Sequence, residues 1–357
     1  MATAETLILG ASYGSLLATK MLLAGHSVTL VCLPEEARLI NREGTRVRLP
    51  IRGRDEPVEI TSKVLPGRVS ATTPDAVDPA EFDLVALAMQ EPQYRSSGVR
   101  ELIDAVAISK RPCMSIMNMP PLTYLRRIPG LDADTLTACY TDPTVWQNFD
   151  PACLTLASPD PQAFRPSPDE PNLLQVSLPT NFKVARFADE EHTAMLRQIQ
   201  TDIEAVRYET DDGPVELPVK LKVHDSVFVP LAKWSMLLTG NYRCVQKDEA
   251  RSIKEAVHTD LEASRGVYEW VSELARKLGA DPGDQVPFEK YAKAAEKLLK
   301  PSSAARAVDA GATQIERVDK LVQLIGRQLG LMNTVVNETV STVDEMLAKN
   351  EEQAQAA

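Results

Sequence analysis

The sequence predicts an α/β fold in which an N-terminal doubly wound sheet domain precedes an all-α C-terminal domain. Two observations predict it. Up to about residue 222, short apolar runs alternate with helical patterns, whereas later apolar residues keep a helical period with almost no strand pattern. The length of 357 residues also leaves room for two domains. We expect the sheet domain over residues 1–222, the helical domain over 223–350 and a frayed tail over 351–357.

The first forty residues predict a β-α-β unit. An apolar run at 6–9 ends in a glycine-containing turn at 10–14, which opens an apolar helix over 16–23. Gly25 ends this helix, and residues 27–33 have the composition of a second buried strand. Such a unit is typical of Rossmann-like dinucleotide-binding domains, because the N–H groups at the start of the helix can bind a pyrophosphate.

The glycine turn departs from the usual fingerprint of these domains. It reads Gly10-Ala-Ser12-Tyr13-Gly14, whereas the dinucleotide-binding motif is G-x-G-x-x-G, so the turn is one residue short and lacks one glycine. An ordinary strand–turn–helix of any α/β protein is therefore the alternative. The strand before it, the helix after it and its N-terminal position favour nucleotide binding.

The rest of the sheet domain alternates between strands, helices and loops. Residues 83–89 form a near-continuous apolar run, as expected of a central parallel strand. The loop at 118–123 follows another buried strand, and ligands of open α/β sheets bind at such carboxyl ends. Elsewhere we expect helices at 35–43, within 91–108 and at 189–206, strands within 44–60 and at 113–117, 135–140, 153–157 and 206–210, and connections at 69–79 and 159–171.

The helical domain is predicted from its periodicity and its end signals. We expect helices at 224–240, 247–279, 287–299, 313–329 and 333–349. Gly279 and Gly330 lie where helices should end, and Pro301 follows a further helix end.

Composition argues against several classes of function. The formal net charge of −11 argues against a nucleic-acid or anionic membrane partner, and no apolar run reaches the ~20 residues of a membrane span. The N-terminal residues lack a signal-peptide pattern. Five scattered cysteines without C-x-x-C spacing predict reduced thiols in a cytoplasmic protein. Neither they nor the four histidines form a metal-ligand cluster.

Further motifs accompany the opening unit. They are the run Asp83–Gln93 with Gln90 and Gln93, Asn118 after the next strand, Leu231-Ala-Lys233-Trp with Asn241 further on, and Pro301-Ser302 with Thr313-Gln314-Ile315-Glu316. On these motifs the chain resembles the ketopantoate reductase family nearly from end to end.

This resemblance implies an NAD(P)-dependent oxidoreductase that interconverts a carbonyl and an alcohol, with the nicotinamide between the domains and a homodimeric assembly. Lys233 is the implied acid–base group, because a ketone that accepts hydride becomes an alkoxide that a nearby ammonium stabilises and protonates. A solvated helix residue is the alternative for Lys233. The candidate substrate-binding residues are Asn118, Asn241, Ser302 and Gln314, and the candidate cofactor-binding residues are Gly10, Ser12, Tyr13, Gly14, Leu33, Glu35, Gln90, Gln93 and Asn118.

Four positions depart from the family pattern. The family has a lysine at Gln90, an asparagine at Leu237, an acid at Gln314 and an arginine at Leu33. Charged groups are thus replaced by amides and leucine, and an amide cannot supply charge. We therefore expect a small organic substrate other than ketopantoate, with less charge and with a larger or aromatic substituent.

The cofactor prediction is NAD or NADP, with NAD slightly favoured. Leu33 stands where an arginine would bind the 2′-phosphate of NADP, and Glu35 lies about where an acid can bind the ribose diol. A first-turn helix acid is an equally weighted role for Glu35. Arg38 and Arg42 are still able to bind a phosphate.

Two site residues and the function as a whole have alternatives. Ser302 fits an N-cap and Asn241 a helix C-terminus. A nicotinamide-binding lyase could instead catalyse retro-aldol cleavage of a C–C bond without net redox. A catalytically inactive nucleotide-binding protein is the third hypothesis, because one glycine of the fingerprint and several polar residues of the family pattern are replaced in this chain.

Overall fold

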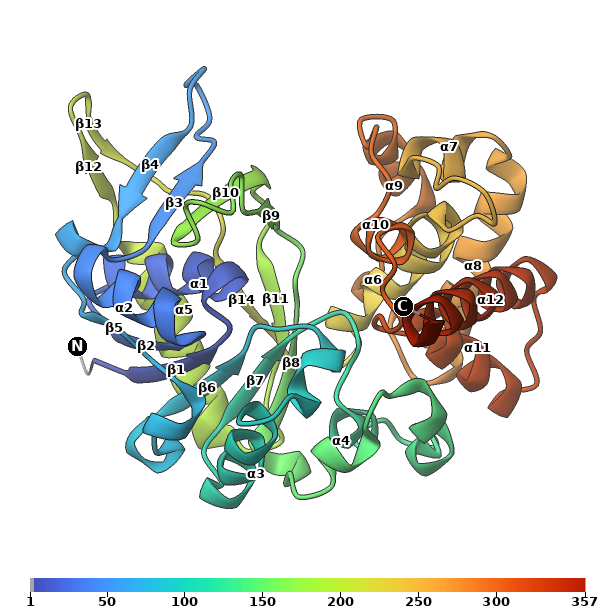
Figure 1. Ribbon diagram of the computed structural model, residues 1–357, viewed down its shortest axis with the longest axis horizontal. Helices are drawn as coiled ribbons and strands as arrows, with labels where there is room; N and C mark the ends of the chain where they lie inside the picture. The colour runs from blue at the N-terminus through green and yellow to red at the C-terminus, as the bar shows by residue number, and fades with distance from the viewer. Residues whose placement is uncertain (1–2, 357) are drawn as a thin grey trace. The chain divides into compact units, whose positions relative to one another are not determined.

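The computed structural model describes residues 3–356, whose contacts group them into two units (Figure 1). The first unit ends at Asp225, close to the expected boundary, but three segments lie in the second: Gln90–Pro92, Leu125–Thr144 and Ser226 onward. Sequence reasoning placed the first two of these segments in the sheet domain.

The first unit is built on an eight-stranded sheet with the strand order β14-β11-β8-β7-β6-β1-β2-β5. The strands from β8 to β5 are mutually parallel, β11 is antiparallel to β8, and β14 is parallel to β11. Their bounds are β1 Glu5–Leu9, β2 Ser27–Val31, β5 Val69–Thr72, β6 Leu84–Leu87, β7 Cys113–Ile116, β8 Leu154–Ser158, β11 Phe182–Ala185 and β14 Leu221–His224. This confirms the predicted doubly wound sheet and the central position of the 83–89 run.

Two predictions at the sheet edges are wrong. The connection expected at 69–79 contains β5, an edge strand whose Ala71 packs into the core against α2. The helix expected from residue 224 starts later, because Leu221–His224 pairs with β11 as β14.

A second, four-stranded sheet has the order β4-β3-β10-β9. It packs on α1 (Ala11–Leu23) from the side opposite to β1 and β2, so that helix lies between two sheets and is buried over almost its whole length. The strands are β3 Arg46–Leu49, β4 Val58–Thr61, β9 Gln162–Phe164 and β10 Leu173–Leu178. Strand β9 lies in the connection expected at 159–171. The strand expected at 206–210 is β12 (Tyr208–Thr210), which pairs with β13 (Gly213–Val215) outside both sheets.

The other helices of the first unit are α2 (Pro34–Glu43), α3 (Val99–Ser109) and α5 (Glu190–Ala205), all near their expected positions. A short α4 (Leu122–Leu125) follows the loop after β7. Short 3₁₀ turns complete the chain: η1 Ser62–Val64, η2 Pro74–Ala76, η3 Pro79–Glu81, η4 Glu91–Arg95, η5 Ala133–Cys139, η6 Pro143–Trp146, η7 Pro151–Cys153, η8 Pro230–Ala232, η10 Tyr242–Cys244 and η11 Pro282–Asp284.

The strand expected at 135–140 is wrong, because this segment is helical. Ala133, Leu136 and Cys139 are buried at every third position, which is the period of a 3₁₀ helix and not of a strand. The segment packs against α11 of the second unit, where the Gln328 side chain bonds to Asp132 at 3.0 and 3.2 Å. That docking explains why Leu125–Thr144 groups with the helices.

The described part of the second unit is helical, as predicted, but its helices are more divided. They are α6 Lys233–Met236, the π-turn η9 Leu237–Asn241, α7 Ile253–His258, α8 Leu261–Lys277, α9 Phe288–Ala295, α10 Ser303–Asp309, α11 Val318–Gln328 and α12 Thr334–Ala356. The expected helix at 247–279 is interrupted because Asp260 caps α8, accepting from the Ala263 N–H at 2.9 Å. Helix α10 was not predicted.

Helix α12 continues to Ala356, so the described residues of the tail expected to fray at 351–357 are helical, and Ala357 lies outside the described residues. Asn350 anchors this helix by donating to the carbonyls of Val308 and Ala312 at 2.8 and 2.9 Å. The five cysteines are free thiols, in agreement with their scattered spacing.

Candidate functional site

The glycine turn lies at the carboxyl end of β1, where the strand order reverses between β2 and β6. Gly10 has φ of +102°, and its N–H donates to the Val31 carbonyl at 3.0 Å. A Cβ atom there would lie 2.6 Å from Met89 Cγ and 2.8 Å from the Ala88 carbonyl oxygen. Glycine is therefore required by conformation and by space, at the switch point where such sheets bind ligands.

Gly14 allows α1 to pack closely on β1. A Cβ atom at this position would lie 2.6 Å from Ile8 Cγ2 and 3.4 Å from Ala88 Cβ. Close helix–strand packing is the role of the last glycine in the fingerprint. The replaced glycine is thus the middle one, where Ser12 stands half-buried in the first turn of α1. The N–H groups of the first turn, including those of Ser12 and Tyr13, have no acceptor within the helix and suit an anion.

The Tyr13 side chain has a structural role. Its hydroxyl donates to the Pro161 carbonyl at 2.7 Å, and its ring meets Phe182 edge-on at 5.9 Å between centroids. Burial and nearby Asp160 raise the pKa of Tyr13 well above its ordinary value, so the phenol stays neutral. The backbone N–H is the part of Tyr13 that suits a ligand.

The end of β2 carries the residues predicted to select between NAD and NADP. Leu33 is 72% exposed and precedes α2, and Glu35 is an exposed first-turn acid that pairs with Arg38. Sequence reasoning missed the buried Glu36, which pairs with Arg165 from the segment after β9. Burial raises the pKa of Glu36, against the effect of Arg165.

Glu36 could have been found from helix periodicity. It lies four residues before the buried Ile40 and next to the buried Ala37, so it shares the inward face of α2. Arg165 could not, because it is 129 residues away in sequence. The pair places both an acid and a cation near the end of β2.

Asn118, Gln90 and Gln93 follow the two central strands. Asn118 is half-buried, two residues after β7, in the predicted loop. Gln90 and Gln93 are exposed, after β6 and within η4. The fully buried Tyr94, which follows Gln93, fixes the end of β6, because its hydroxyl accepts from the Met89 N–H at 2.9 Å. Gln90 groups with the second unit, although it directly follows Met89.

Lys233 begins α6 and is half-buried beside the fully buried Trp234. The helix then widens into the π-turn that ends at Asn241. Tyr291 explains the widening: its hydroxyl donates to the Met236 carbonyl at 3.1 Å and lies 2.1 Å from where a Cβ of Gly240 would be. A side chain bonded into the helix ladder is a known cause of such bulges, which are frequent at functional sites.

Ser302 and Asn241 are joined directly. The Ser302 hydroxyl donates to the Asn241 backbone carbonyl at 2.7 Å and accepts from the Ala305 N–H at 3.1 Å. The structure therefore shows the N-cap alternative for Ser302, whose hydroxyl is buried. Its substrate role stays a prediction, whereas the half-buried Asn241 side chain keeps its predicted role open.

Gln314 is exposed on the loop before α11, but Glu316, two residues later, is only 8% exposed. A Glu316 carboxylate oxygen accepts from the Glu91 N–H at 3.4 Å. Glu91 is 2% exposed, and its carboxylate accepts from the Thr141 N–H at 3.1 Å and the Thr141 hydroxyl at 2.9 Å. Burial raises the pKa of Glu91 to about 7; Thr141 opposes the shift and Glu316 adds to it.

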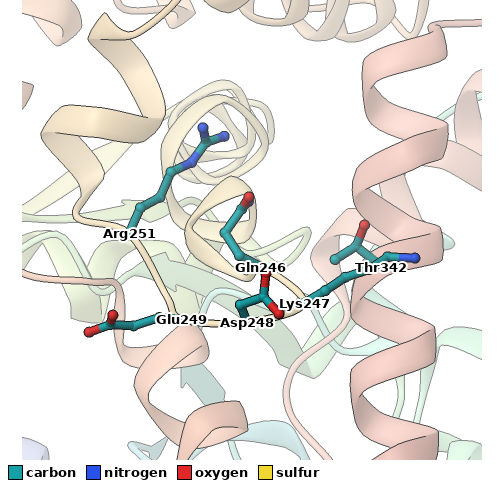
Figure 2. Close-up of a pocket in the computed structure, with 6 residues that line it drawn as sticks. All are labelled: Gln246, Lys247, Asp248, Glu249, Arg251 and Thr342. Atoms are coloured by element: carbon teal, nitrogen blue, oxygen red, sulfur yellow. The ribbon is translucent and has the colours of Figure 1, made fainter.

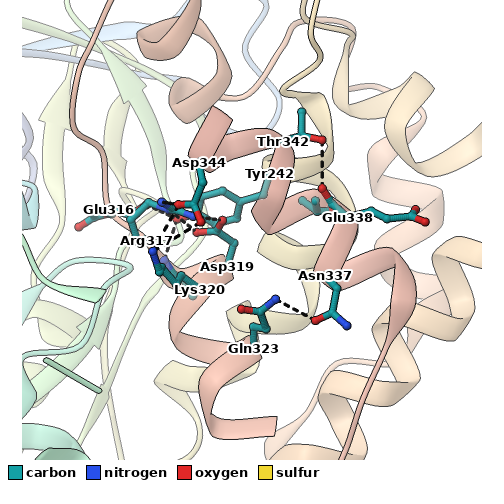
Figure 3. A network of polar contacts seen from close by, with 12 residues as sticks. Tyr242, Glu316, Arg317, Asp319, Lys320, Gln323, Asn337, Glu338, Thr342 and Asp344 are labelled. Carbon is teal, nitrogen blue, oxygen red and sulfur yellow. Dashed lines mark hydrogen bonds and ion pairs between the residues drawn. The ribbon is translucent and has the colours of Figure 1, made fainter. Parts of the chain in front are cut away.

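The start of α11 is fixed to α12 by polar contacts of Arg317 (Figure 3). Arg317 makes two bonds of 2.9 Å to the fully buried Asp319 and also pairs with Asp344 of α12. The Tyr242 hydroxyl donates to the Glu316 carbonyl and accepts from the Val318 N–H at 3.0 Å. These contacts hold the loop that carries Gln314 against the residue that follows Asn241.

The second unit also has a polar pocket of about 570 Å³ (Figure 2). It lies between the loop before α7 and helix α12, and it is lined by Gln246, Lys247, Asp248, Glu249, Arg251 and Thr342. Lys247 pairs with Glu345 at 2.7 Å. No predicted site residue lines this pocket, so it lies apart from the site proposed from sequence.

Among residues 3–356, no cluster of side chains has the composition of a metal site, and no helix has the length and hydropathy to span a membrane. These findings concern the described residues alone.

Comparison with known proteins identifies the fold. No protein-family model matches the chain, and no curated protein matches its sequence. Solved structures do match. A proposed ketopantoate reductase from Ralstonia solanacearum MolK2 aligns with a TM-score of 0.70 at 14% identity, over 98% of this chain and 99% of that one.

Two further structures align over nearly the whole chain. One is D-mandelate dehydrogenase in a ternary structure with NADH and anilino(oxo)acetate, with a TM-score of 0.62 and 11% identity over 97% of this chain and 99% of that one. The other is a dimeric ketopantoate reductase from Staphylococcus aureus, with a TM-score of 0.59 and 10% identity over 97% and 99%. The chain therefore has the ketopantoate reductase fold, a sheet domain followed by a helical domain, as the resemblance implied.

Proposed function

We propose that this chain is an NAD(P)-dependent oxidoreductase that interconverts a carbonyl and an alcohol on a small organic substrate other than ketopantoate. The glycine turn supports this proposal most strongly. Gly10 has no space for a side chain, and its turn ends β1 at the reversal of strand order. Dinucleotides bind at this point in sheets of this topology.

The chain's residues fit a nicotinamide dinucleotide in the first unit. The unbonded N–H groups at the start of α1, from Ala11 to Tyr13, would hold the pyrophosphate, and the ribose would lie near Leu33 and Glu35. We favour NAD slightly, because Leu33 offers no charge to a 2′-phosphate. Asn118 and the glutamines at 90 and 93 are the proposed polar contacts of the nicotinamide end.

Lys233 is the proposed acid–base group of the second unit. The bound nicotinamide supplies or accepts the hydride. The Lys233 ammonium stabilises the alkoxide and donates a proton to its oxygen, and in the reverse direction the neutral amine accepts the alcohol proton. Asn241 and Gln314 orient the substrate through their amides, which donate and accept hydrogen bonds without carrying charge.

The proposed substrate class follows from the polar and charged residues of the family pattern that this chain lacks. Gln90, Leu237 and Gln314 stand where the family has two charged groups and an asparagine. We infer a substrate with fewer charges than ketopantoate and with an apolar or aromatic substituent. The similar fold of D-mandelate dehydrogenase supports this inference, because mandelate carries an aromatic ring.

A nucleotide-binding protein without catalysis is the second candidate. Ser12 in place of the middle glycine favours it, because that glycine lets the backbone approach the pyrophosphate.

We also propose a homodimer, since one protein of this fold is dimeric.

The first experiment is calorimetric titration of the purified, cofactor-stripped protein with NAD⁺, NADH, NADP⁺ and NADPH. We expect micromolar binding of one oxidised–reduced pair, followed by turnover with aliphatic and aromatic 2-oxo acids. Binding without turnover of any carbonyl or alcohol would favour the non-catalytic candidate. The absence of binding by all four cofactors would overturn the proposed function.

A further inference from the structure

Three residues proposed to contact ligands have neighbours in sequence that bond to one another. Glu91 follows Gln90, Tyr242 follows Asn241, and Glu316 lies two residues after Gln314. The Glu91 N–H donates to the Glu316 carboxylate at 3.4 Å, and the Tyr242 hydroxyl donates to the Glu316 carbonyl.

Glu91 connects this arrangement to a third segment. Its carboxylate accepts from the N–H and the hydroxyl of Thr141, at 3.1 and 2.9 Å. The carboxylate is almost fully buried, and such a group is costly unless its bonds are satisfied. The Glu91 carboxylate therefore fixes residues 90–92 against Thr141, and the Glu91 backbone N–H links the same residues to the loop before α11.

We propose that Glu91 is a positioning residue of the active site. Through its contacts with Thr141 and Glu316, Glu91 holds Gln90 and Gln314 in a fixed arrangement. The effect of Glu91 on catalysis rests on the proposed function, but its role in holding these segments together does not. Glu91 acts through its neighbours and is not assigned a contact with substrate.

The surroundings of Glu91 make this arrangement dependent on pH. The groups that face it are the carboxylate of Glu316, the phenol of Tyr140, the hydroxyl and N–H of Thr141 and the backbone of Asp142. The Thr141 donors favour the carboxylate form, whereas burial and Glu316 favour the protonated form. A protonated Glu91 would give up one of the bonds it accepts, which loosens the link to Thr141.

The test uses the full chain with the variants Glu91→Gln, Glu91→Ala and Thr141→Val, and with Glu338→Gln as a control. Glu338 is an exposed glutamate of the same unit, whose side chain is drawn pointing away from the network in Figure 3. Glutamine keeps the shape of Glu91 but does not titrate, so that variant preserves folding while it removes the charge.

Hydrogen–deuterium exchange is the first readout, and it requires no ligand. Glu91→Ala keeps the N–H that bonds to Glu316 but releases residues 90–92 from Thr141. We therefore expect faster exchange in peptides covering 88–93 and 137–145 and, to a smaller extent, 311–319, with α8 unchanged. Faster exchange in 137–145 alone would overturn the proposal, because Glu91 would then serve only as the partner of Thr141.

Kinetics of NADH or NADPH oxidation with a 2-oxo acid, measured between pH 5.5 and 9, are the second readout. We expect Glu91→Ala to lower kcat by about tenfold to a hundredfold, and Glu91→Gln to lower it less and to remove a pH-dependent step near neutrality. Wild-type kcat, KM and pH profile in both variants would overturn the proposal. If the wild type binds no nicotinamide cofactor, the proposed function fails while the exchange experiment still decides the role of Glu91.

Discussion

The two units build their candidate site residues in different ways. In the first unit the essential features are backbone groups and missing side chains: Gly10 and Gly14 leave no room for a Cβ atom. In the second unit they are side chains held by buried polar contacts, among them Glu91, Glu316 and Asp319. A backbone site tolerates change at the side chains around it, whereas a site of buried charges depends on each partner.

The largest expected effect tests chemistry in the second unit. Replacing Lys233 by Ala should lower turnover by about 10²–10⁴-fold, because the proposed proton donor is lost. The affinity for NADH, measured by calorimetry, should stay within a few-fold of wild type. The exposed Lys254 offers a matched control as Lys254→Ala. Unchanged turnover in Lys233→Ala would remove the acid–base role.

A second prediction concerns the buried charges of the same unit. Asp319→Ala removes the main buried partner of Arg317. Because the buried guanidinium then lacks its counter-charge, the free energy of unfolding should fall by about 3–5 kcal/mol. The measurement is urea denaturation followed by circular dichroism. Asp344→Ala, at a half-exposed partner of Arg317, should cost less. Equal losses for the two variants would contradict the importance of burial.

In the first unit, Gly10→Ala should cost about 1–3 kcal/mol from the strained φ and more from the contact with the Ala88 carbonyl. It should also abolish micromolar cofactor binding. Gly130→Ala is the control for strain alone, because Gly130 also has positive φ, +76°, but open space around its Cβ position. If both variants lose the same stability, the close approach at Gly10 is not needed.

The pH dependence of stability offers a finer comparison. Because the folded pKa of Glu91 is raised to about 7 from 4.5, its proton favours the folded state. That contribution is fully present below about pH 4.5 and is lost as the pH rises through about 7. The difference in unfolding free energy between wild type and Glu91→Gln should therefore change by about 2–3 kcal/mol over this range. A constant difference would show that Glu91 does not titrate there.

The smallest expected effect concerns cofactor choice in the first unit. Arg165→Ala removes a cation near the end of β2 and should weaken NADPH binding several-fold while changing NADH binding less than twofold. Calorimetric titration with both cofactors measures this. Equal effects on NADPH and NADH binding would mean that Arg165 does not lie near the 2′-phosphate of the bound cofactor.

The contrast also explains what could be predicted from the sequence. The β1-α1-β2 unit, the 83–89 strand and the Asn118 loop depend on local apolar patterns, and the structure confirms them. Glu91 and Thr141 were missed because their contact joins segments 50 residues apart. The strand expected at 135–140 failed for a similar reason, since its burial comes from docking on α11.

Local signals also mislead where a distant side chain intervenes. The helix that carries Lys233 was expected to be regular to residue 240, but Tyr291 widens it before Asn241. The π-turn changes the helical register between Lys233 and Asn241, and no pattern within 224–240 predicts it.

The division of the chain into two units affects how fragments of it can be designed. The helical unit is not one continuous stretch, because it takes Gln90–Pro92 and Leu125–Thr144 from within the first unit's sequence. A fragment starting at Ser226 would lack the partners that Glu316 and Gln328 have in the full chain. We therefore expect that such a fragment does not fold as an intact module, and that a chimaera of two relatives needs segments 90–92 and 125–144 from the same parent as the helices.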